Sequence, residues 1–563
     1  MIQPVEDLLQ EKLYMHQFKI NGKMAFEGDV WQWHQDYGTW FNDDLMPSAR
    51  AMNVAIFLDE VTEFNGPLLF IPGSHKKGII KAKHDLTTTS YPLWTIDNDL
   101  IRQLVDRAGG RKGGIVSPQG PAGSMIIFHS CLVHASSNNL SQFNRSINEA
   151  FIGCGKFISM FLSQYNHLKK IKIDTIVDIN IGQAKKNCLN SGLSEDTINK
   201  INFVNSIEEA IDRDIEIFIE ATGNPIIGTV HAYKIIKKKK HVILVNVEAD
   251  VTCGKYLSDL AKENDVICSM AYGDQPSLIV EQIEWARLNG FFVVCAGKGT
   301  KYHPTFEYST PDTVWEHYGL SKERAEVESG MNPKMFNSFL CGDKSAIEMC
   351  AVSNAANLKC PSHGLTFPPV GVYDIAKNLI PKSEGGLIEY EGQVEVISSI
   401  DLDKKDIQND LRWGVFIVIK AQNQYVKNCF KDYGMVTDSS GNYSAIWRPY
   451  HYIGLELAQS IYSIALDNKA TGFTKKYNAD VATYAKKDLK IGEKLDGEGG
   501  FCSRGKLITS KKSKEEKILP LGLTDGAEVI KNIKKDEVIK ISDVKLNLPK
   551  EVTKAREYQY NLI

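Results

Sequence analysis

The chain has 563 residues and a formal net charge of -3, with 43% hydrophobic and 24% charged residues. These values are ordinary for a globular protein of about three domains, and they leave no basic footprint for a nucleic acid. No signal peptide is visible and no uncharged apolar run could span a bilayer, so we expect a cytoplasmic protein without a membrane partner. The 11 cysteines show no C-x-x-C spacing, which favours reduced thiols.

The first segment, residues 1–147, has a β-rich pattern with alternating runs at 51–58 and 124–128. Its chemistry lies in the stretch WQWHQDYGTW, residues 31–40. In a strand, His34 and Asp36 project from the same face and can present an imidazole and a carboxylate to one ion. His134 is the candidate for a second histidine. Two histidines and one carboxylate are the ligand set of non-haem Fe(II) oxygenases, which bind a 2-oxo acid and O₂ at the open positions.

These residues resemble the phytanoyl-CoA dioxygenase family, and in particular its ectoine hydroxylase branch. MHQFKIN, WHQDYGTW, FNGPLLFIPGSHK and GPAGSMIIFH carry the resemblance. It implies that His34, Asp36 and His134 bind Fe²⁺ and that Arg145 anchors 2-oxoglutarate, since a guanidinium binds a carboxylate bidentately. It further implies that Gln17 and Asn21 line the cosubstrate and the substrate. His129 stands where that branch has aspartate, so it is not expected to be a ligand.

The resemblance covers only the middle of that family's fold. The segment starts just before the first motif, and residues 148–152 are needed as the first strand of the next domain. We therefore expect a partial double-stranded β-helix, or jelly roll, whose open side exposes apolar side chains and unpaired strand edges. Such a segment is a dioxygenase fragment joined without a linker to a second protein, either active as a hydroxylase or inactive.

Residues 148–164, NEAFIGCGKFISMFLSQ, have the pattern of an opening strand, glycine turn and helix of a Rossmann domain. Gly153 and Gly155 supply the turn, and the N–H groups from Lys156 face a pyrophosphate. Asp178 ends the next apolar strand, at the distance where a carboxylate takes the ribose hydroxyls of NAD. Ile158 occupies the third glycine position and is expected to push the helix outward. The predicted cofactor contacts of this domain are Gly153, Gly155, Lys156, Phe157, Asp178, Thr222 and Gly223.

Alternating strands and helices continue to about residue 300, which predicts a parallel, doubly wound sheet. Ligands of such sheets bind beyond the carboxyl ends of the strands. We expect Glu248 there, and also Lys298 and Lys301 on a glycine-rich turn after a strand at 291–296. The two lysines could stabilise a developing alkoxide or hold a phosphate, or they could be solvated.

The stretch NPKMFNSFLCGDKSAIEM places three charged side chains on or before one helix. Asp343 and Glu348 could bind Mg²⁺ or Mn²⁺ beside Lys344. Equally, Lys344 and Glu348 could form an i,i+4 pair on the surface of the helix.

The second segment resembles homoserine dehydrogenase in its cofactor half, and more closely a group of related proteins that end in a SAF domain. GCGKFISMFLSQ, VNVEADVTCG, AGKGTKYHP and GMNPKMFNSFLCGDKSAIEM are among the stretches that carry it. Some members are similar in role to 1-deoxy-D-xylulose 5-phosphate reductoisomerase, which implies NADPH, a divalent metal and isoprenoid precursor synthesis. Asp178 would repel the 2′-phosphate of NADP, whereas Lys185 and Lys186 could compensate, so the choice between NAD and NADP stays open.

The third segment, from about residue 451, begins with an expected helix at 453–466. Short strands and the phrase IKKDEVIKISDV resemble the SAF β-clip module, which implies a lid or an oligomer contact. Asp496 and Glu498 either reach a sugar or are turn residues, and the lysine run at 511–517 is expected to be a solvated loop.

Taken together, the sequence predicts an α/β protein with a Rossmann-type doubly wound sheet, an α+β catalytic domain, a SAF β-clip and a partial jelly roll. The expected domains are residues 1–147, 148–300, 301–450 and 451–563. We expect an NAD(P)-dependent oxidoreductase that acts on a small, phosphorylated sugar-type carbonyl compound, as a homo-oligomer. The alternatives are hydroxylation by the first segment, a homoserine dehydrogenase-like activity, or an inactive fusion.

Overall fold

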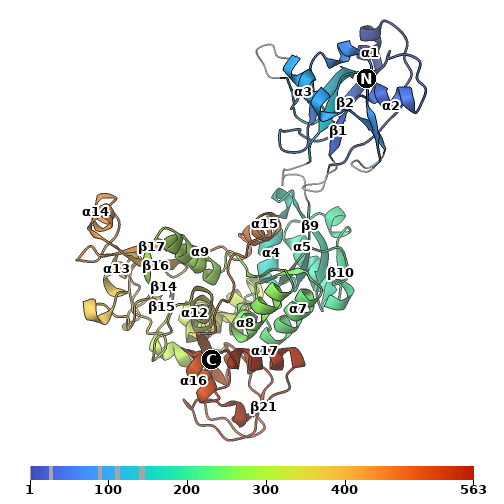
Figure 1. The fold of residues 1–563 in the computed structure, drawn as a ribbon. Coiled ribbons are helices and arrows are strands. Elements are labelled where there is room, and N and C mark those ends of the chain that lie inside the picture. Colours follow the sequence, from blue (N-terminus) through green and yellow to red (C-terminus); the bar gives the residue numbers. More distant parts are fainter. Residues whose placement is uncertain (1, 24–29, 87–91, 108–113, 139–145) are drawn as a thin grey trace. The chain divides into compact units, whose positions relative to one another are not determined.

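The computed structural model describes residues 2–23, 30–86, 92–107, 114–138 and 146–563 (Figure 1). The chain forms two compact units, Met1–Ser146 and Ile147–Ile563, called unit 1 and unit 2 below. Within the described residues, none of the helices has both the length and the apolar character needed to cross a membrane.

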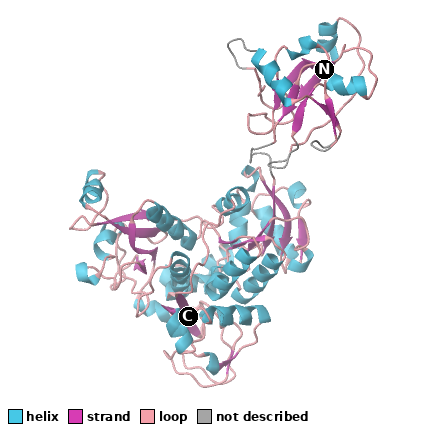
Figure 2. Ribbon diagram, viewed as in Figure 1, coloured by secondary structure: helices cyan, strands magenta, loops and turns pink. Residues whose placement is uncertain are grey.

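Unit 1 is built from short antiparallel strands, shown in magenta in Figure 2. The larger sheet has the order β3 (Leu68–Phe70), β7 (His134–Ser136), β1 (Trp31–His34), β5 (Leu93–Thr95) and β4 (Lys83–Asp85). The smaller sheet pairs β2 (Met52–Ile56) with β6 (Met125–His129). The helices are α1 (Ile2–Leu9), α2 (Asp36–Asn42) and α3 (Asn98–Arg107). This arrangement confirms the predicted partial roll of antiparallel sheets.

The two-stranded sheet of unit 1 has an exposed apolar face. Val54 and Ile56 lie two residues apart in β2 and so share a face, and Ile56 lies opposite Met125 of β6. The exposed fractions of Val54, Ile56 and Met125 are 37%, 41% and 42%. Large apolar side chains are seldom this exposed side by side in a well-covered sheet. The predicted exposure of apolar side chains on an open roll is thereby confirmed.

The double variant Val54→Thr/Ile56→Thr is expected to bind less of a fluorescent apolar-surface dye than the wild-type protein. Because both side chains are already exposed, their truncation should change the free energy of unfolding by less than about 1 kcal/mol. Dye titration and thermal unfolding of the full chain measure the two effects. Leu288→Thr, at a side chain that is 84% exposed in unit 2, is the matched control. An unchanged dye signal in the double variant would contradict the expectation.

Unit 2 begins with a six-stranded parallel sheet of order β10-β9-β8-β11-β12-β13. In chain order its strands are β8 (Ile147–Ile152), β9 (Ile171–Val177), β10 (Asn202–Val204), β11 (Ile217–Glu220), β12 (His241–Leu244) and β13 (Cys268–Met270). The order therefore reverses between β8 and β11, which is the arrangement of a Rossmann-type sheet. The predicted fold class is confirmed.

Helices cover both faces of this sheet. They are α4 (Lys156–Leu162), α5 (Ile181–Asn190), α6 (Glu195–Ile198), α7 (Pro225–Lys237) and α8 (Val247–Glu263). The next helix, α9 (Gln275–Leu288), packs instead on the second sheet described below. Successive residues of a strand point to opposite faces, so Phe218 packs into the cluster with α7 and α8. Ile217 and Ile219 pack into the cluster with α4 and α5. Apolar residues on both faces explain why these strands read as continuous hydrophobic runs.

The central strand β8 carries a buried carboxyl group without a partner. Glu149 is fully buried, and within the described residues neither of its side-chain oxygens has a hydrogen-bond partner. Burial raises the pKa of Glu149 well above its ordinary value. Burial therefore favours the neutral form of this carboxyl in the folded protein, at the cost of an unsatisfied polar group.

Glu149→Met is expected to raise the free energy of unfolding by about 1 to 3 kcal/mol at neutral pH, because it removes an unpaired buried polar group. The unfolded chain loses the Glu149 proton above about pH 4.3 and must regain it on folding. Wild-type stability therefore falls as pH rises above that value, and the advantage of the variant should shrink toward acid pH. Denaturant titrations across this window test both effects. Glu195→Met, at an exposed site in α6, is the control. If the gain in unfolding free energy of Glu149→Met does not vary with pH, the explanation by a buried neutral carboxyl is wrong.

A second, mixed sheet follows, with the order β15-β14-β16-β17. Its strands are β14 (Phe292–Thr300), β15 (Gln393–Ser398), β16 (Val415–Lys420) and β17 (Tyr443–Arg448). The prediction that the strand at 291–296 belongs to the parallel sheet was wrong, and so was the prediction of a glycine-rich turn around Lys298. Lys298 lies inside β14, and Gly297 and Gly299 serve close strand packing. A Cβ at Gly297 would lie 1.7 Å from the carbonyl oxygen of Glu395, and one at Gly299 would lie 1.9 Å from that of Leu411.

The helices of this region are α10 (Val314–Tyr318), α11 (Pro333–Cys341), α12 (Asp343–Ala356), α13 (Ile375–Asn378) and α14 (Gln424–Asp432). Helix α12 is buried along its whole length and packs against α8 and α9. After α14 the chain forms α15 (Ala458–Asp467), which covers the α4 side of the parallel sheet.

The C-terminal part contains the predicted short hairpins. β18 (Ala479–Ala485) pairs with β19 (Ser503–Thr509), and β20 (Glu528–Val529) pairs with β21 (Val544–Lys545). The lysine run at 511–517 was predicted as a loop, but most of it lies in helix α16 (Ser510–Glu515), which Thr509 caps. The last helix, α17 (Lys550–Tyr560), packs against α7 and α8.

Candidate functional sites

His34, Asp36 and His134 come together in unit 1. The metal-ligating atoms of the three side chains all lie within 4.8 Å of one another. The Nε2 atoms of His34 and His134 lie 3.6 Å and 3.5 Å from the two carboxylate oxygens of Asp36. The pairing of β1 with β7 sets the two histidines opposite each other. Over the part of the chain that the structure describes, this is the one group of three or more such side chains close enough to hold a metal ion.

Asp36 reaches this centre by a route that differs from the prediction. β1 ends at His34, Gln35 is extended, and Asp36 is the first residue of α2, so the two ligands do not alternate along one strand. The buried amide of Gln35 fixes the turn. Its Nε2 donates to the carbonyl oxygens of Gly78 and Cys131 at 2.9 Å and 2.6 Å, and its Oε1 accepts from an amide N–H at 2.9 Å.

Both histidines are held with Nε2 toward the carboxylate. The Nδ1 atoms of His34 and His134 lie 2.6 Å and 2.9 Å from backbone carbonyl oxygens, to which they donate. In the neutral form of the imidazole, this arrangement leaves Nε2 as the nitrogen that can bind a metal ion. Burial and the nearby His34 lower the pKa of His134 to about 4. Burial opposes ionisation of Asp36, but both histidines outweigh it and hold its pKa well below the usual range. This donor set fits a divalent transition metal.

The other residues predicted for unit 1 are less informative. Arg145 lies outside the described residues. Gln17 is exposed and donates to Asp44 at 3.4 Å, and Asn21 is also exposed. His129 accepts a hydrogen bond from the N–H of Cys131 at 3.0 Å and is not part of the three-residue centre.

The glycine turn of the parallel sheet has the geometry of a nucleotide-binding turn. Gly153 has a φ of +86°, and a Cβ there would lie 2.9 Å from the carbonyl oxygen of Ala221 at the end of β11. Asp178 accepts a hydrogen bond from the N–H of Cys154 at 2.8 Å, so the acidic residue lies directly beside the turn. Only glycine therefore fits position 153, because a side chain there would meet the backbone of Ala221.

The remaining predicted cofactor contacts lie at the same edge. Gly155, Lys156, Thr222 and Gly223 are exposed there, and Phe157 is half-buried. Ile158, at the third glycine position, is fully buried in the core with Phe161. Helix α4 nevertheless forms from Lys156 and packs on the sheet, so a bulky residue is accommodated at this position.

A buried charge cluster lies between the parallel sheet, the mixed sheet and the C-terminal part. Lys298 forms an ion pair with Glu348, and Lys344 forms one with Glu248. Lys298 and Glu348 are only 4% and 3% exposed. The members of the cluster are Glu248, Asp274, Lys298, Lys344, Glu348 and Glu498.

Of the two alternatives for α12, the i,i+4 surface pair of Lys344 and Glu348 is wrong. Lys344 and Glu348 are enclosed by other elements, and each takes a different partner. Burial would lower the pKa of Lys344, but the surrounding carboxylates, Glu248 foremost, outweigh it and raise that pKa. Asp343 is fully buried and accepts from the backbone N–H groups of Gly499 and Gly505 at 2.8 Å and 2.6 Å. Its carboxylate therefore fastens the C-terminal part to α12.

The cluster adjoins the carboxyl edge of the parallel sheet. Glu248 lies in the first turn of α8, directly after β12, and Asn246 before it donates to the carbonyl oxygen of Asn224 at 2.8 Å. Ligands of doubly wound sheets bind at this edge. Lys301, in contrast, donates to the carbonyl oxygen of His317 at 2.6 Å and is not a member of the cluster.

Two members of the cluster were missed or undervalued in the sequence. Asp274 was not singled out, because Asp-Gln-Pro before a helix is the ordinary signature of an N-cap, and Asp274 is indeed the N-cap of α9. Glu498 was weighed as a turn residue in a glycine-rich loop. Its neighbour Asp496 does have that role, since it accepts from the N–H groups of Phe501 and Cys502 at 2.5 Å and 3.0 Å.

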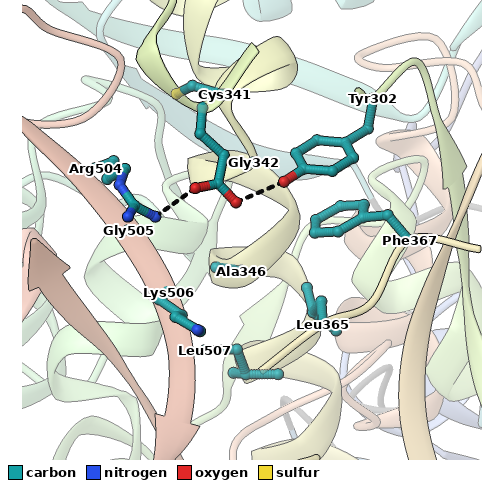
Figure 3. A pocket seen from close by; sticks show the side chains of 11 residues that line it. Tyr302, Cys341, Gly342, Ala346, Leu365, Phe367, Arg504, Gly505, Lys506 and Leu507 are labelled. Carbon is teal, nitrogen blue, oxygen red and sulfur yellow. Dashed lines mark hydrogen bonds and ion pairs between the residues drawn. The ribbon is translucent and has the colours of Figure 1, made fainter. Parts of the chain in front are cut away.

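Beside α12 lies a pocket of about 70 Å³ between the mixed-sheet region and β19 (Figure 3). Tyr302 stacks on Phe367 at one side, with ring centroids 3.8 Å apart. Glu307 accepts a hydrogen bond from Tyr302 at 2.7 Å and forms an ion pair with Arg504 of β19 at 2.7 Å. These contacts, drawn as dashed lines in Figure 3, join the C-terminal part to the region that supplies Lys298 and Lys344.

Three parts of the chain match known protein families. Residues 1–147 match phytanoyl-CoA dioxygenase (PhyH), residues 273–457 match the catalytic domain of oxidoreductase DRL, and residues 481–545 match the SAF domain. In unit 2, the Rossmann-type sheet is thus followed by a region similar to the DRL catalytic domain and by one similar to the SAF domain. Unit 1 is similar to phytanoyl-CoA dioxygenase and contains a set of two histidines and one aspartate.

Individual proteins resemble unit 1. L-proline trans-4-hydroxylase of Streptomyces griseoviridis is 40% identical over 147 residues, which are 25% of this chain and 55% of that protein. Ectoine dioxygenase of Sphingopyxis alaskensis is 35% identical over 145 residues, which are 25% of this chain and 46% of that protein. The chain thus spans about half the length of the curated relatives it matches.

Solved structures similar to this chain include a putative oxidoreductase, yvaA, from Bacillus subtilis. It is 12% identical with a TM-score of 0.31 and covers 59% of this chain and 92% of that one. 1-Deoxy-D-xylulose 5-phosphate reductoisomerase from Zymomonas mobilis with NADPH is 14% identical with a TM-score of 0.26, covering 37% of this chain and 58% of that one.

Proposed function

We propose that unit 2 is an NAD(P)-dependent oxidoreductase that reduces the carbonyl group of a small, phosphorylated sugar-type compound. The observation that carries this proposal is the buried charge cluster at the carboxyl edge of the Rossmann-type sheet. It brings two lysines from different elements, Lys298 and Lys344, to the edge where Gly153 and Asp178 form a nucleotide-binding turn. The match of residues 273–457 to a DRL catalytic domain supports it.

The residues of the cluster suit carbonyl reduction. A reduced nicotinamide dinucleotide, when bound, supplies a hydride. The ammonium groups of Lys298 and Lys344 are fixed by their carboxylate partners and offer positive charge to an oxygen that becomes negative. Because this part of the protein is largely closed to water, that charge acts with little screening. The same lysines can hold a phosphate group of the substrate.

The narrower form of the proposal is a reductoisomerase acting on 1-deoxy-D-xylulose 5-phosphate in isoprenoid precursor synthesis, with Mg²⁺ or Mn²⁺. Among the described residues, the cluster has no three ligand atoms as close together as those of His34, Asp36 and His134. The side chains therefore support carbonyl reduction without a metal best. Whether turnover needs Mg²⁺ or Mn²⁺ distinguishes this reaction from that of a reductoisomerase.

The test is oxidation of NADPH and NADH by the purified full chain with 1-deoxy-D-xylulose 5-phosphate, other sugar phosphates and aspartate semialdehyde. Each substrate is offered with and without Mg²⁺ or Mn²⁺. We expect turnover with at least one phosphorylated carbonyl compound and loss of that turnover in Lys298→Met. Absence of both dinucleotide binding and turnover would overturn the proposal. Turnover that needs the metal would establish the narrower form.

A second function is carried by the metal centre of unit 1. We propose that His34, Asp36 and His134 bind Fe²⁺ and that unit 1 hydroxylates a small amino-acid-like compound with 2-oxoglutarate. The matching relatives are named for L-proline and ectoine, so these two compounds are the first substrates to test. Equimolar Fe²⁺ binding and substrate-dependent consumption of 2-oxoglutarate are expected. Iron binding without any 2-oxoglutarate consumption would leave unit 1 a metal-binding domain and reject the hydroxylase.

A further inference from the structure

The loop between β18 and β19 brings a carboxyl group from the C-terminal part into the charge cluster. Glu498 lies in the sequence Asp-Gly-Glu-Gly-Gly, within the segment that matches the SAF domain. It is half-buried and faces Glu248 of α8 together with Lys344 and Asp343 of α12. The cluster is thus built from the Rossmann-type part, the DRL-type part and the SAF-type part together.

This loop is held in place at several points. The backbone of Gly499 donates to Asp343 at 2.8 Å and accepts from the Nδ2 of Asn337 at 2.8 Å. Gly499 has a φ of +65°, and a Cβ there would lie 2.1 Å from the carbonyl oxygen of Lys334 in α11. Lys486 donates to the carbonyl oxygen of Gly500 at 3.0 Å. The loop is seated too closely for Glu498 to be a freely moving surface residue.

Glu498 also differs from the other carboxylates of the cluster. Lys344 pairs with Glu248, and Lys298 pairs with Glu348, so neither lysine is devoted to Glu498. Burial and the negative charge of Glu248 raise the pKa of Glu498 to about 8, against the opposing effect of Lys344. Glu498 therefore holds a proton at neutral pH, while it is still accessible enough to meet a substrate.

We propose that Glu498, supplied by the SAF-type segment, is the proton donor of the carbonyl reduction carried out by unit 2. The proposal rests on the proposed oxidoreductase function. It makes the SAF-type segment a part of the catalytic machinery, where the sequence indicated a lid or an oligomer contact.

The proton balance of the step is simple. The carbonyl carbon gains a hydride from the reduced nicotinamide dinucleotide, which is thereby oxidised, and the electron pair of the C=O double bond moves to oxygen. The O–H bond of the Glu498 carboxyl breaks, and its proton joins that oxygen to give the alcohol. Lys344 and Lys298 stabilise the negative charge during the transfer. The Glu498 carboxylate then takes a proton from solvent before the next turnover.

Glu498→Gln tests the proposal, because it keeps the size and hydrogen-bonding capacity of the side chain but removes the transferable proton. We expect kcat to fall at least about 100-fold, with dinucleotide binding and thermal stability retained. Wild-type kcat should fall above about pH 8, where Glu498 loses its proton, and the residual activity of the variant should lack this fall. Glu498→Asp should recover part of the activity.

Glu493→Gln, in the same segment but on the surface beside Lys487, is the matched control and should behave as wild type. If the wild-type protein is active and the kcat of Glu498→Gln is within about threefold of the wild-type kcat, the proposal is overturned. An alkaline fall that persists in the variant would do the same. A wild-type protein without any turnover would instead reject the proposed oxidoreductase function, and the proton donor with it.

Discussion

Lys344→Met is expected to lower the free energy of unfolding of unit 2 by about 3 to 5 kcal/mol, because it removes one partner of a buried ion pair. Lys344 faces Glu248, Glu498 and Asp274, and without it these carboxyl groups have lost their nearest cation. The same substitution should abolish turnover, since it removes one of the two positive charges offered to the substrate oxygen. Denaturant titration and dinucleotide oxidation measure the two effects.

The matched control is Lys475→Met. Lys475 forms an ion pair with Glu284 at 2.9 Å, but both side chains are more than a third exposed. Such pairs contribute about 0 to 1 kcal/mol, so the control should lose little stability and no activity. If Lys344→Met and Lys475→Met lose equal stability and activity, the ion pair in the cluster matters no more than an ion pair on the surface.

Asp36→Ala is expected to abolish Fe²⁺ binding by unit 1, with at least about a 100-fold loss of affinity. Asp36 is the single carboxylate of the centre, and its two oxygens face both histidines. Without it, two imidazoles remain, and a site with one ligand fewer and no negative charge holds Fe²⁺ much more weakly. Iron retention after gel filtration and 2-oxoglutarate consumption give independent measurements.

His129→Ala is the control for this variant. His129 is a histidine of the same unit, but its Nδ1 is engaged with the backbone of Cys131, outside the centre. The control should retain iron. Iron that stays bound to Asp36→Ala, or is lost equally from His129→Ala, would show that the metal is held elsewhere.

The sequence contained enough information for the local parts of both sites. His34, Asp36 and His134 were found because the stretches around them resemble the phytanoyl-CoA dioxygenase family, and the pairing of β1 with β7 brings the two histidines together. The helical position of Asp36 could not be foreseen, because it depends on hydrogen bonds from Gln35 to Gly78 and Cys131, far along the chain. A local sequence pattern shows only the periodicity of a strand or helix, whereas contacts with distant residues fix the turn at Gln35 that places Asp36.

The mixed sheet shows the same limit. Gly297 and Gly299 around Lys298 read as a turn, because glycine is most often a turn residue. In the structure they let β14 approach neighbouring backbones, which only the packing of distant segments reveals. Glu498 was undervalued for a related reason. A glycine-rich loop has no periodicity, so nothing in its sequence indicates that it enters a cluster formed by α8 and α12.

Helix α17 has a consequence for synthesis of the chain. Arg556 donates to the carbonyl oxygen of Thr252, which lies 304 residues earlier, and forms an ion pair at 2.7 Å with the buried Asp480. A ribosome releases the N-terminal parts first, so the face of α8 that α17 covers stays open to the cell until α17 itself has emerged. Unit 2 thus completes this part of its core only after α17 has been synthesised. A chain that stops before Arg556 would leave Asp480 buried without its cation, and the uncovered face of α8 would stay open to chaperones and proteases.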